Sequence, residues 1–164
     1  MQKKLFLLRH AKSSWKDINQ IDFDRPLNRR GNHDAPIMGK RIQLKHKCPE
    51  KILCSTALRA RQTLTNLRLD SAEITFDDSI YQAVPKDLLN IIKKQEQQFN
   101  SLMLVGHNPS ITMLASYLLK VHLEDMPTCS LYILTFDTVF WKDIEHCSIA
   151  IEDYDYPKKH INFV

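Results

Sequence analysis

The chain has 164 residues, of which 43% are hydrophobic and 26% are charged. This balance is typical of a globular domain and excludes a disordered, collagenous or membrane-embedded chain. Because a domain of this length buries roughly 70% of the surface that its unfolded chain exposes, we expect one self-sufficient domain over residues 1–164. The only glycines are Gly31, Gly39 and Gly106, which excludes both the GxGxxG dinucleotide loop and the P-loop.

The net charge of +4 hides a gradient along the chain. Residues 1–82 carry +7 and residues 83–164 carry −3, and all eight arginines lie between Arg9 and Arg68. Since the guanidinium fork matches the geometry of phosphate, this clustering favours an anion-binding site in the first half. A solvated basic face is the alternative.

The spacing of the cysteines indicates whether a metal site is expected, and the length of the apolar runs indicates whether the protein enters a membrane. No CxxC pair occurs, so neither a zinc site nor a thioredoxin-like motif is indicated, and we expect four buried thiols and no metal. No stretch approaches the roughly 20 apolar residues of a membrane span, and the apolar run at Leu5–Leu8 is too short for a signal peptide. We therefore expect a cytoplasmic protein without membrane partners. The cysteines are Cys48, Cys54, Cys129 and Cys147.

Short apolar strands alternate with segments that have helical apolar spacing. At the C-terminal end, strands at Ser130–Phe136 and Ser148–Asp153 follow one another with no helical pattern between them. The pattern predicts an α/β fold in which a mostly parallel sheet with an antiparallel, hairpin-like edge is covered by helices on both faces. In chain order, the earlier elements are a strand at Lys4–Leu8, a helix at Asn32–Lys45, a strand at Ile52–Cys54, a helix at Leu58–Leu67, a strand at Ile74–Phe76, a helix at Lys86–Lys94, a strand at Leu102–Val105 and a helix at Pro109–Leu119.

Polar residues gather where three of these strands end. They lie in Arg9–Ser14, in Ser55–Arg59 and in Gly106–Pro109. In an open α/β sheet the ligand crevice lies beyond the carboxyl ends of the strands. If the strands are parallel, two arginines, two histidines and two helix N-termini meet there, and phosphate is the expected ligand.

Arg9 and Arg59 have the chemistry to hold a phosphoryl group, whose oxygens need positive charge. Ser55 lies four residues before Arg59 and is predicted to cap the helix, which would put Arg59 in the first turn beside the positive end of the helix dipole. The alternative for each arginine is a surface salt bridge.

His10 is the better candidate for a nucleophile. A histidine can attack phosphorus when one ring nitrogen is unprotonated and the other is held by a backbone carbonyl. His107 is the expected partner that donates to a phosphate oxygen. A structural role is usual for a lone histidine, but two at matching strand ends favour the catalytic interpretation. Structural or exposed roles are expected for His33, His46, His122, His146 and His160.

At this point the chain resembles the histidine phosphatase superfamily, with its phosphoglycerate-mutase-like fold, and within it the SixA branch of phosphohistidine phosphatases. The resemblance covers Leu5 to about Phe136, and RHAKSS, RPLNRRG, SxxxRAxQT and GHNP occur in that order on the expected elements. The matching segments are LFLLRHAKSSW at 5–15, DFDRPLNRRG at 22–31, HDAPIMGKRI at 33–42, CSTALRARQT at 54–63, LMLVGHNPSIT at 102–112 and MPTCSL at 126–131.

The resemblance implies a three-layer α/β/α sandwich and a role for each matched residue. His10 would be the phosphorylated nucleophile, Arg9 and Arg59 the phosphate ligands, and His107 the second histidine of the pocket. Ser13, within the RHAKSS motif, is placed with the phosphate-binding residues. The resemblance also implies no metal and no other cofactor.

One departure from the family bears on the substrate. Larger relatives that cleave alcohol phosphates typically use a glutamate after the third strand as proton donor, whereas Asp77–Gln82 contains none. Imidazole, with a pKa of about 6.5, leaves far more readily than an alkoxide. The missing acid therefore favours phosphohistidine as substrate, although Asp22, Asp24 or Asp78 could supply a proton.

The short chain leaves little room for a lid around a small molecule, so we expect a phosphohistidine-bearing protein as partner. Lys12, Arg25 and Arg29 are candidate docking residues at the mouth, or simply solvated charges. A small-molecule phosphomonoesterase with the same two-step mechanism and a noncatalytic phosphate-binding module are the alternatives. Nucleic acid is not expected, because no stripe of basic and aromatic residues is present. No feature predicts an oligomeric state.

Overall fold

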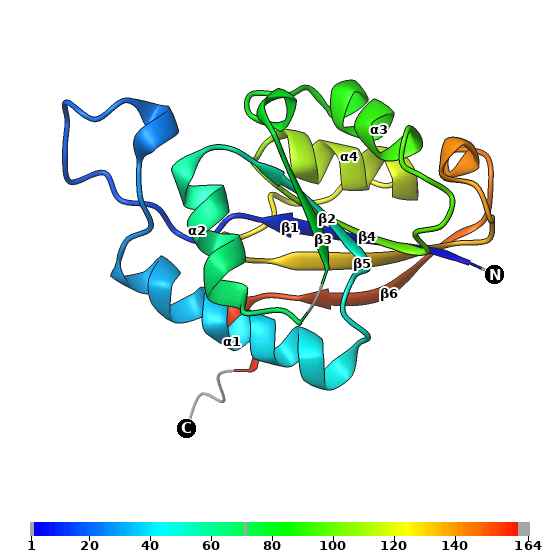
Figure 1. Cartoon of the computed structure of the whole chain (residues 1–164), viewed down its shortest axis with the longest axis horizontal. Helices are drawn as coiled ribbons and strands as arrows, with labels where there is room; N and C mark the ends of the chain where they lie inside the picture. Colours follow the sequence, from blue (N-terminus) through cyan, green and yellow to red (C-terminus); the bar gives the residue numbers. More distant parts are fainter. Residues whose placement is uncertain (1, 71, 161–164) are drawn as a thin grey trace.

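One six-stranded sheet organises residues 2–70 and 72–160, which are the residues described by the computed structural model (Figure 1). The strand order is β3-β2-β4-β1-β5-β6. The first four strands are mutually parallel, and β5 pairs antiparallel with both β1 and β6. The predicted mostly parallel sheet with an antiparallel edge is confirmed. The strands are β1 at Lys3–Arg9, β2 at Lys51–Ser55, β3 at Glu73–Asp77, β4 at Ser101–Gly106, β5 at Leu131–Phe136 and β6 at Ile149–Asp155.

Helices cover both faces of the sheet, so the three-layer sandwich is also confirmed (Figure 1). The pleat of β1 divides the core in two. Leu5 and Leu7 pack in a buried cluster with side chains of α3 and α4, whereas Phe6 and Leu8 pack with side chains of α1 and α2. The helices are α1 at Arg29–Lys45, α2 at Leu58–Leu67, α3 at Pro85–Lys93 and α4 at Ser110–Leu119.

Three details differ from the sequence-based expectations. Helix α1 begins at Arg29, three residues early, because the side chain of Asn28 caps it by accepting a hydrogen bond from the backbone N–H of Gly31. Strand β3 forms the outer edge of the sheet and is largely exposed. Only two of the four cysteines are buried; Cys48 and Cys147 are partly exposed because they lie outside the strands and helices.

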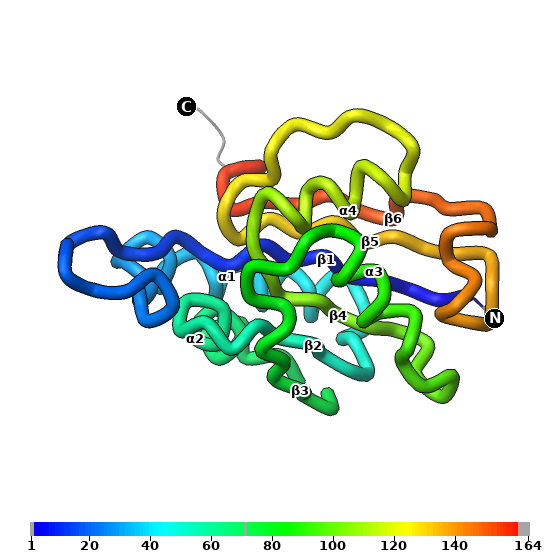
Figure 2. Tube along the Cα trace, turned by 90° about the horizontal axis from the view of Figure 1, so that it is seen from above, coloured from blue at the N-terminus to red at the C-terminus, as the bar shows by residue number. Residues whose placement is uncertain are grey.

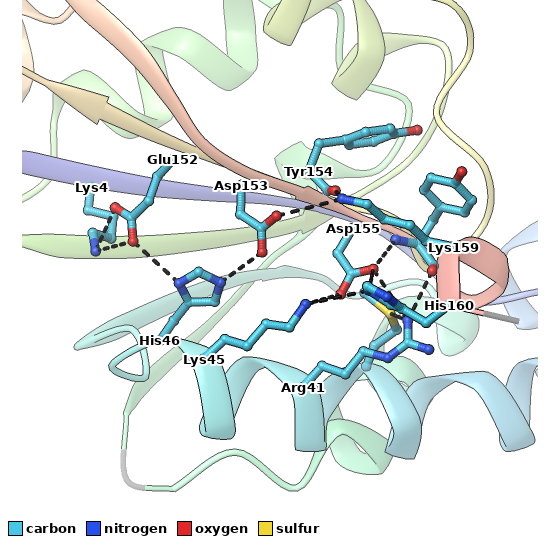
Figure 3. Close-up of polar contacts among 12 residues, drawn as sticks. Lys4, Arg41, Lys45, His46, Glu152, Asp153, Tyr154, Asp155, Lys159 and His160 are labelled. Carbon is cyan, nitrogen blue, oxygen red and sulfur yellow. Dashed lines mark hydrogen bonds and ion pairs between the residues drawn. The ribbon is translucent and has the colours of Figure 1, made fainter. Parts of the chain in front are cut away.

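The C-terminal turn of α1 is tied to β6 by ion pairs (Figure 3). The ring of His46 contacts Glu152 through Nδ1 at 3.3 Å and Asp153 through Nε2 at 2.9 Å. The buried carboxylate of Asp155 pairs with Arg41 at 3.3 Å and with Lys45 at 3.5 Å. These contacts fasten the antiparallel edge to the helical layer, and they account for His46 as a structural histidine.

The carboxyl ends of β1, β2 and β4 lie together. Arg9 pairs with Gly106 across β1 and β4, and Cys54 pairs with Val105 across β2 and β4. Residues 10–28, between β1 and α1, extend beyond this edge of the sheet and contain the short 3-10 helix η1 at Asp22–Asp24 (Figures 1 and 2). Within the described residues, no helix is long and apolar enough to cross a membrane.

Candidate active site

A cleft of about 340 Å³ opens where β1, β2 and β4 end, with residues 10–28 as one wall. Every residue that the sequence analysis assigned to catalysis or phosphate binding lines it. The strand ends that were expected to meet at one edge of the sheet therefore do form one cleft. The cleft is lined by Arg9, His10, Lys12, Ser13, Trp15, Asp22, Arg25, Arg59, Tyr81, Gln82, His107, Asn108 and Thr128.

His10 is buried at the floor of the cleft. Its Nδ1 lies 2.7 Å from the backbone carbonyl oxygen of Ala11, and the Nε of Arg59 donates to its Nε2 at 3.3 Å. Because a guanidinium nitrogen cannot accept a hydrogen bond, the network assigns the proton to Nδ1 and a lone pair to Nε2. Burial, opposed by the hydrogen bond to Ala11 and reinforced by the nearby His107 and Arg59, lowers the pKa of His10 to about 3. The ring is thus neutral near pH 7.

His107 faces His10, with 5.1 Å between the ring centroids. Its Nε2 lies 2.7 Å from the hydroxyl oxygen of Ser55. Its Nδ1 is buried and has no hydrogen-bond partner among the described residues. Burial, followed by the positive charge of Arg59, lowers the pKa of His107 to about 4. Two neutral histidines therefore stand side by side.

Two arginines complete the floor. Arg9 donates from Nη1 to the backbone oxygen of Met126 at 2.6 Å, and its buried Nε has no partner among the described residues. Arg59 is buried in the first turn of α2, as predicted. Its Nη1 and Nη2 donate to the backbone and carboxylate oxygens of Asp22 at 2.7 and 3.0 Å. Both guanidinium groups are thereby held in place.

The prediction that Ser55 caps α2 is wrong. Ser55 is the last residue of β2, the N-cap position of α2 is Ala57, and that cap has no side-chain hydrogen bond. The Ser55 hydroxyl accepts a weak bond from the backbone N–H of Ala57 at 3.3 Å, and its main contact is with His107. Its place at the end of β2, three residues before α2 begins at Leu58, directs it to the cleft.

Asp22 is the cleft residue whose contacts the sequence analysis missed. Its Oδ2 accepts from Arg59 at 3.0 Å and from the hydroxyl of Tyr81 at 2.7 Å, and its Oδ1 accepts from Arg25 at 3.0 Å. Burial raises the pKa of Asp22, but the hydrogen bonds from Tyr81 and Arg25 and the charge of Arg59 outweigh it and lower the pKa to about 2. No local pattern reveals this network, because its members are far apart in sequence.

Ser13 and Arg25 lie together inside the cleft. The Ser13 hydroxyl accepts from Nη1 of Arg25 at 2.7 Å, and the indole ring of Trp15 lies 3.5 Å from the Arg25 guanidinium carbon. Arg25 is buried, so the expectation of a docking charge at the mouth is wrong for it: bonds to Asp22 and Ser13 draw it inward. Lys12 lines the cleft, whereas Arg29 does not.

The three candidate proton donors have different positions. Asp22 lines the cleft, but its low pKa keeps it ionised and makes it a poor acid. Asp78 accepts a hydrogen bond from the Thr56 hydroxyl at 2.6 Å, and neither Asp78 nor Asp24 lines the cleft. No glutamate is among the lining residues of the described cleft.

In residues 2–70 and 72–160, no group of three or more histidine, cysteine, aspartate or glutamate side chains is placed to hold a metal ion. What the lining residues supply is positive charge, two neutral imidazoles and hydrogen-bond donors. These groups suit an anion with several oxygens.

Comparison with known proteins decides the family. Residues 5–82 match the model of the histidine phosphatase superfamily, branch 1, which covers His10 and Arg59. A protein from Mycobacterium tuberculosis is 30% identical over 161 residues, which span 92% of this chain and all of that protein. The chain belongs to the histidine phosphatase superfamily. His107 lies beyond the residues that the family model matches, and the fold brings it to the same cleft.

Solved structures place this histidine phosphatase near SixA. A protein from Agrobacterium tumefaciens named as the phosphohistidine phosphatase SixA is 29% identical, with a TM-score of 0.83 over 94% of this chain and 98% of that one. A protein from Nakamurella named in the same way is 22% identical, with a TM-score of 0.84 over 96% and 97% of the two chains. The predicted resemblance to the SixA branch and the phosphoglycerate-mutase-like fold are confirmed.

Proposed function

We propose that this histidine phosphatase removes the phosphoryl group from phosphohistidine on another protein, through a covalent intermediate on His10. Membership of the superfamily supports phosphatase activity. The observation that carries the proposal is the state of His10, whose Nδ1 is bound to the Ala11 carbonyl and whose unprotonated Nε2 faces Arg59. A fixed lone pair beside a guanidinium group is what attack on a phosphoryl group requires.

In the first step, Nε2 of His10 forms a bond to phosphorus while the P–N bond of the substrate breaks. The substrate ring reacts in its imidazolium form, in which solvent has protonated the nitrogen that is not bonded to phosphorus. The electron pair of the broken P–N bond returns to the other nitrogen, so the ring leaves as neutral imidazole. Arg9 and Arg59 offset the charge on the phosphoryl oxygens. Nε of Arg9 and Nδ1 of His107, both buried without partners among the described residues, would find partners in those oxygens.

In the second step, water attacks the phosphorus of phospho-His10. An O–P bond forms, the P–N bond breaks and its electron pair returns to Nε2, while the proton lost by water leaves with inorganic phosphate and solvent. Nδ1 keeps its proton and its bond to Ala11 throughout. The site is thereby restored without a cofactor.

The acids in the cleft support this choice of substrate class. An alkoxide leaving group needs a proton in the transition state, whereas imidazole does not. The carboxyl of Asp22, with a pKa of about 2, is ionised at neutral pH, and no glutamate lines the described cleft. Phosphohistidine therefore suits this site better than an alkyl phosphate.

A leaving-group series tests this proposal. We expect kcat/KM to fall steeply from phosphohistidine through aryl phosphate to alkyl phosphate, because no acid compensates for a poorer leaving group. Comparable rates on all three would contradict phosphohistidine as the preferred substrate. Substituting Asp22, Asp24 and Asp78 singly would then identify the donor, and absence of turnover on every substrate would favour a noncatalytic phosphate-binding module.

A small-molecule phosphomonoesterase remains the second candidate. The cleft volume of about 340 Å³ falls within the range of small-ligand sites, roughly 300–1,000 Å³. The same histidines and arginines would serve both substrates. The series above separates the two, since an esterase would turn over an alkyl phosphate at a rate close to that of phosphohistidine.

A further inference from the structure

Helix α4 exposes apolar side chains that the core does not use. It contains no charged residue between Ser110 and Leu119. Ile111 and Leu114 on its inner face are fully buried, but Met113 and Tyr117 on its outer face are 53% and 56% exposed. A helix that is apolar on all sides is normally buried, and an exposed apolar stripe marks a binding surface.

This stripe is one wall of a groove between α3 and α4, which lie on the same face of the sheet (Figure 2). The groove has a volume of about 470 Å³. The hydroxyl of Ser110 donates to the backbone oxygen of Ala83, which fixes the start of α4 against the chain that leads into α3. The groove is lined chiefly by Val84, Pro85, Leu89, Met113, Tyr117 and Glu145.

Two chain segments lead from the cleft to the groove. Tyr81 and Gln82 line the cleft and Val84, 55% exposed, lines the groove. Likewise Asn108 lines the cleft and Met113 lines the groove. Pro109 and the first turn of α4 separate Asn108 from Met113, so their Cα atoms are at most about 12 Å apart.

We propose that this groove is the docking surface for the phosphohistidine-bearing protein substrate. In this proposal the phosphohistidine lies on a helix of the substrate protein. Apolar side chains about two turns along the same helix from the phosphohistidine pack into the groove. The inference rests on the proposed function. An interface of about 800 Å² per partner has a radius of about 16 Å, which exceeds the bound of about 12 Å between the cleft residue Asn108 and Met113. A small substrate held in the cleft has no such reach.

The composition of the groove fits a protein partner. Methionine and tyrosine are enriched in protein interfaces, where an apolar centre is surrounded by a polar rim. Here the rim is formed by the exposed Lys86 and by Glu145, which accepts from the Tyr117 hydroxyl at 2.8 Å and pairs with Lys93. A groove between two helices suits a third, amphipathic helix.

Three substrates with the same leaving group test the proposal. The first is a helical peptide with one central phosphohistidine and leucines four and seven residues to either side, the second has glutamine at those positions, and the third is free phosphohistidine. We expect the wild type to prefer the leucine peptide over the glutamine peptide by about tenfold in kcat/KM. The variant Met113→Glu should lose this preference and hydrolyse free phosphohistidine as the wild type does.

A matched control is Leu44→Glu, since Leu44 is an exposed apolar residue of α1, on the opposite face, with 75% of its surface accessible. It should keep the preference. Equal rates on the two peptides, or an unchanged preference in Met113→Glu, would overturn the docking surface while leaving the proposed function intact. No hydrolysis of any of the three substrates by the wild type would overturn the proposed function itself. A dimer in sedimentation velocity that Met113→Glu converts to a monomer would assign the groove to a second copy and so contradict the proposal.

Discussion

The Nε of Arg59 lies 3.3 Å from the Nε2 of His10, although 49 residues separate them in the chain. This single contact joins the end of β1 to the first turn of α2 and fixes which nitrogen of His10 is free. It also places a positive charge beside the nitrogen that would attack phosphorus. The predictions that follow depend on this pair and on its immediate neighbours.

A covalent intermediate should form on His10, because its Nε2 is the unprotonated nitrogen at the floor of the cleft. Rapid quenching with labelled substrate should trap phosphate that is labile in acid and stable in base. His10→Ala should trap none. Label retained by this variant would place the nucleophile elsewhere.

Arg59→Ala should lower kcat/KM by about 10²-fold or more, because loss of a preorganised charge donor typically costs about 3–4 kcal/mol of transition-state stabilisation. Arg61→Ala, on the exposed side of the same helix, is the control and should change the rate little. Circular dichroism should show that both variants fold. Equal rates for the two variants would remove Arg59 from the site.

Asp22→Asn should strengthen the binding of orthovanadate by about three- to tenfold, because it removes a negative charge close to the bound anion. The amide oxygen of asparagine can still accept from Tyr81 or Arg25, which keeps the wall of the cleft in place. Inhibition constants measured at constant ionic strength would check this. Weaker binding would show that the carboxylate orders Arg59 more than it repels the ligand.

The low pKa values of the two cleft histidines predict how stability depends on pH. His10 and His107 have folded pKa values of about 3 and 4, against about 6.5 in the unfolded chain. The unfolded state therefore binds more protons below pH 6.5, so the free energy of unfolding should decrease as the pH falls from 7 to 5. His10→Ala should show a smaller decrease over that range.

Urea titrations at several pH values would measure this decrease, with His122→Ala as the control because His122 is exposed. Nuclear magnetic resonance of the ring nitrogens should show neither cleft histidine titrating above pH 5. A titration of His10 near pH 6.5 would mean that its surroundings do not hold it neutral.

Prolonged chelation should leave activity unchanged. The prediction follows from the cysteine spacing and from the need for unligated ring nitrogens on His10 and His107. Activity would be assayed on free phosphohistidine before and after treatment with EDTA. Loss of activity that a single divalent ion restores would contradict the two-histidine mechanism.

Much of the fold could be predicted because the signals for it are local. Apolar runs such as Ile52–Cys54 and the helical spacing in Leu58–Leu67 predicted strand β2 and helix α2. Parallel strands bring their carboxyl ends to one edge, so placing Arg9, His10, Arg59 and His107 in one cleft needed only the strand assignment. The predicted ends of helices were less accurate where a capping side chain sets the first residue, as that of Asn28 does for α1.

The sequence by itself thus determined the layers of the fold, the strand ends that form the cleft and the residues with the chemistry to hold phosphate. Only the tertiary structure decided what those residues contact. Ser55 turns to His107, and Asp22 reaches Arg59 and Tyr81, which are 37 and 59 residues away. Residues 10–28 carry no periodic pattern, and their course is set by these long-range hydrogen bonds. Local periodicity records burial against the sheet, whereas hydrogen bonds between distant residues leave no trace in it.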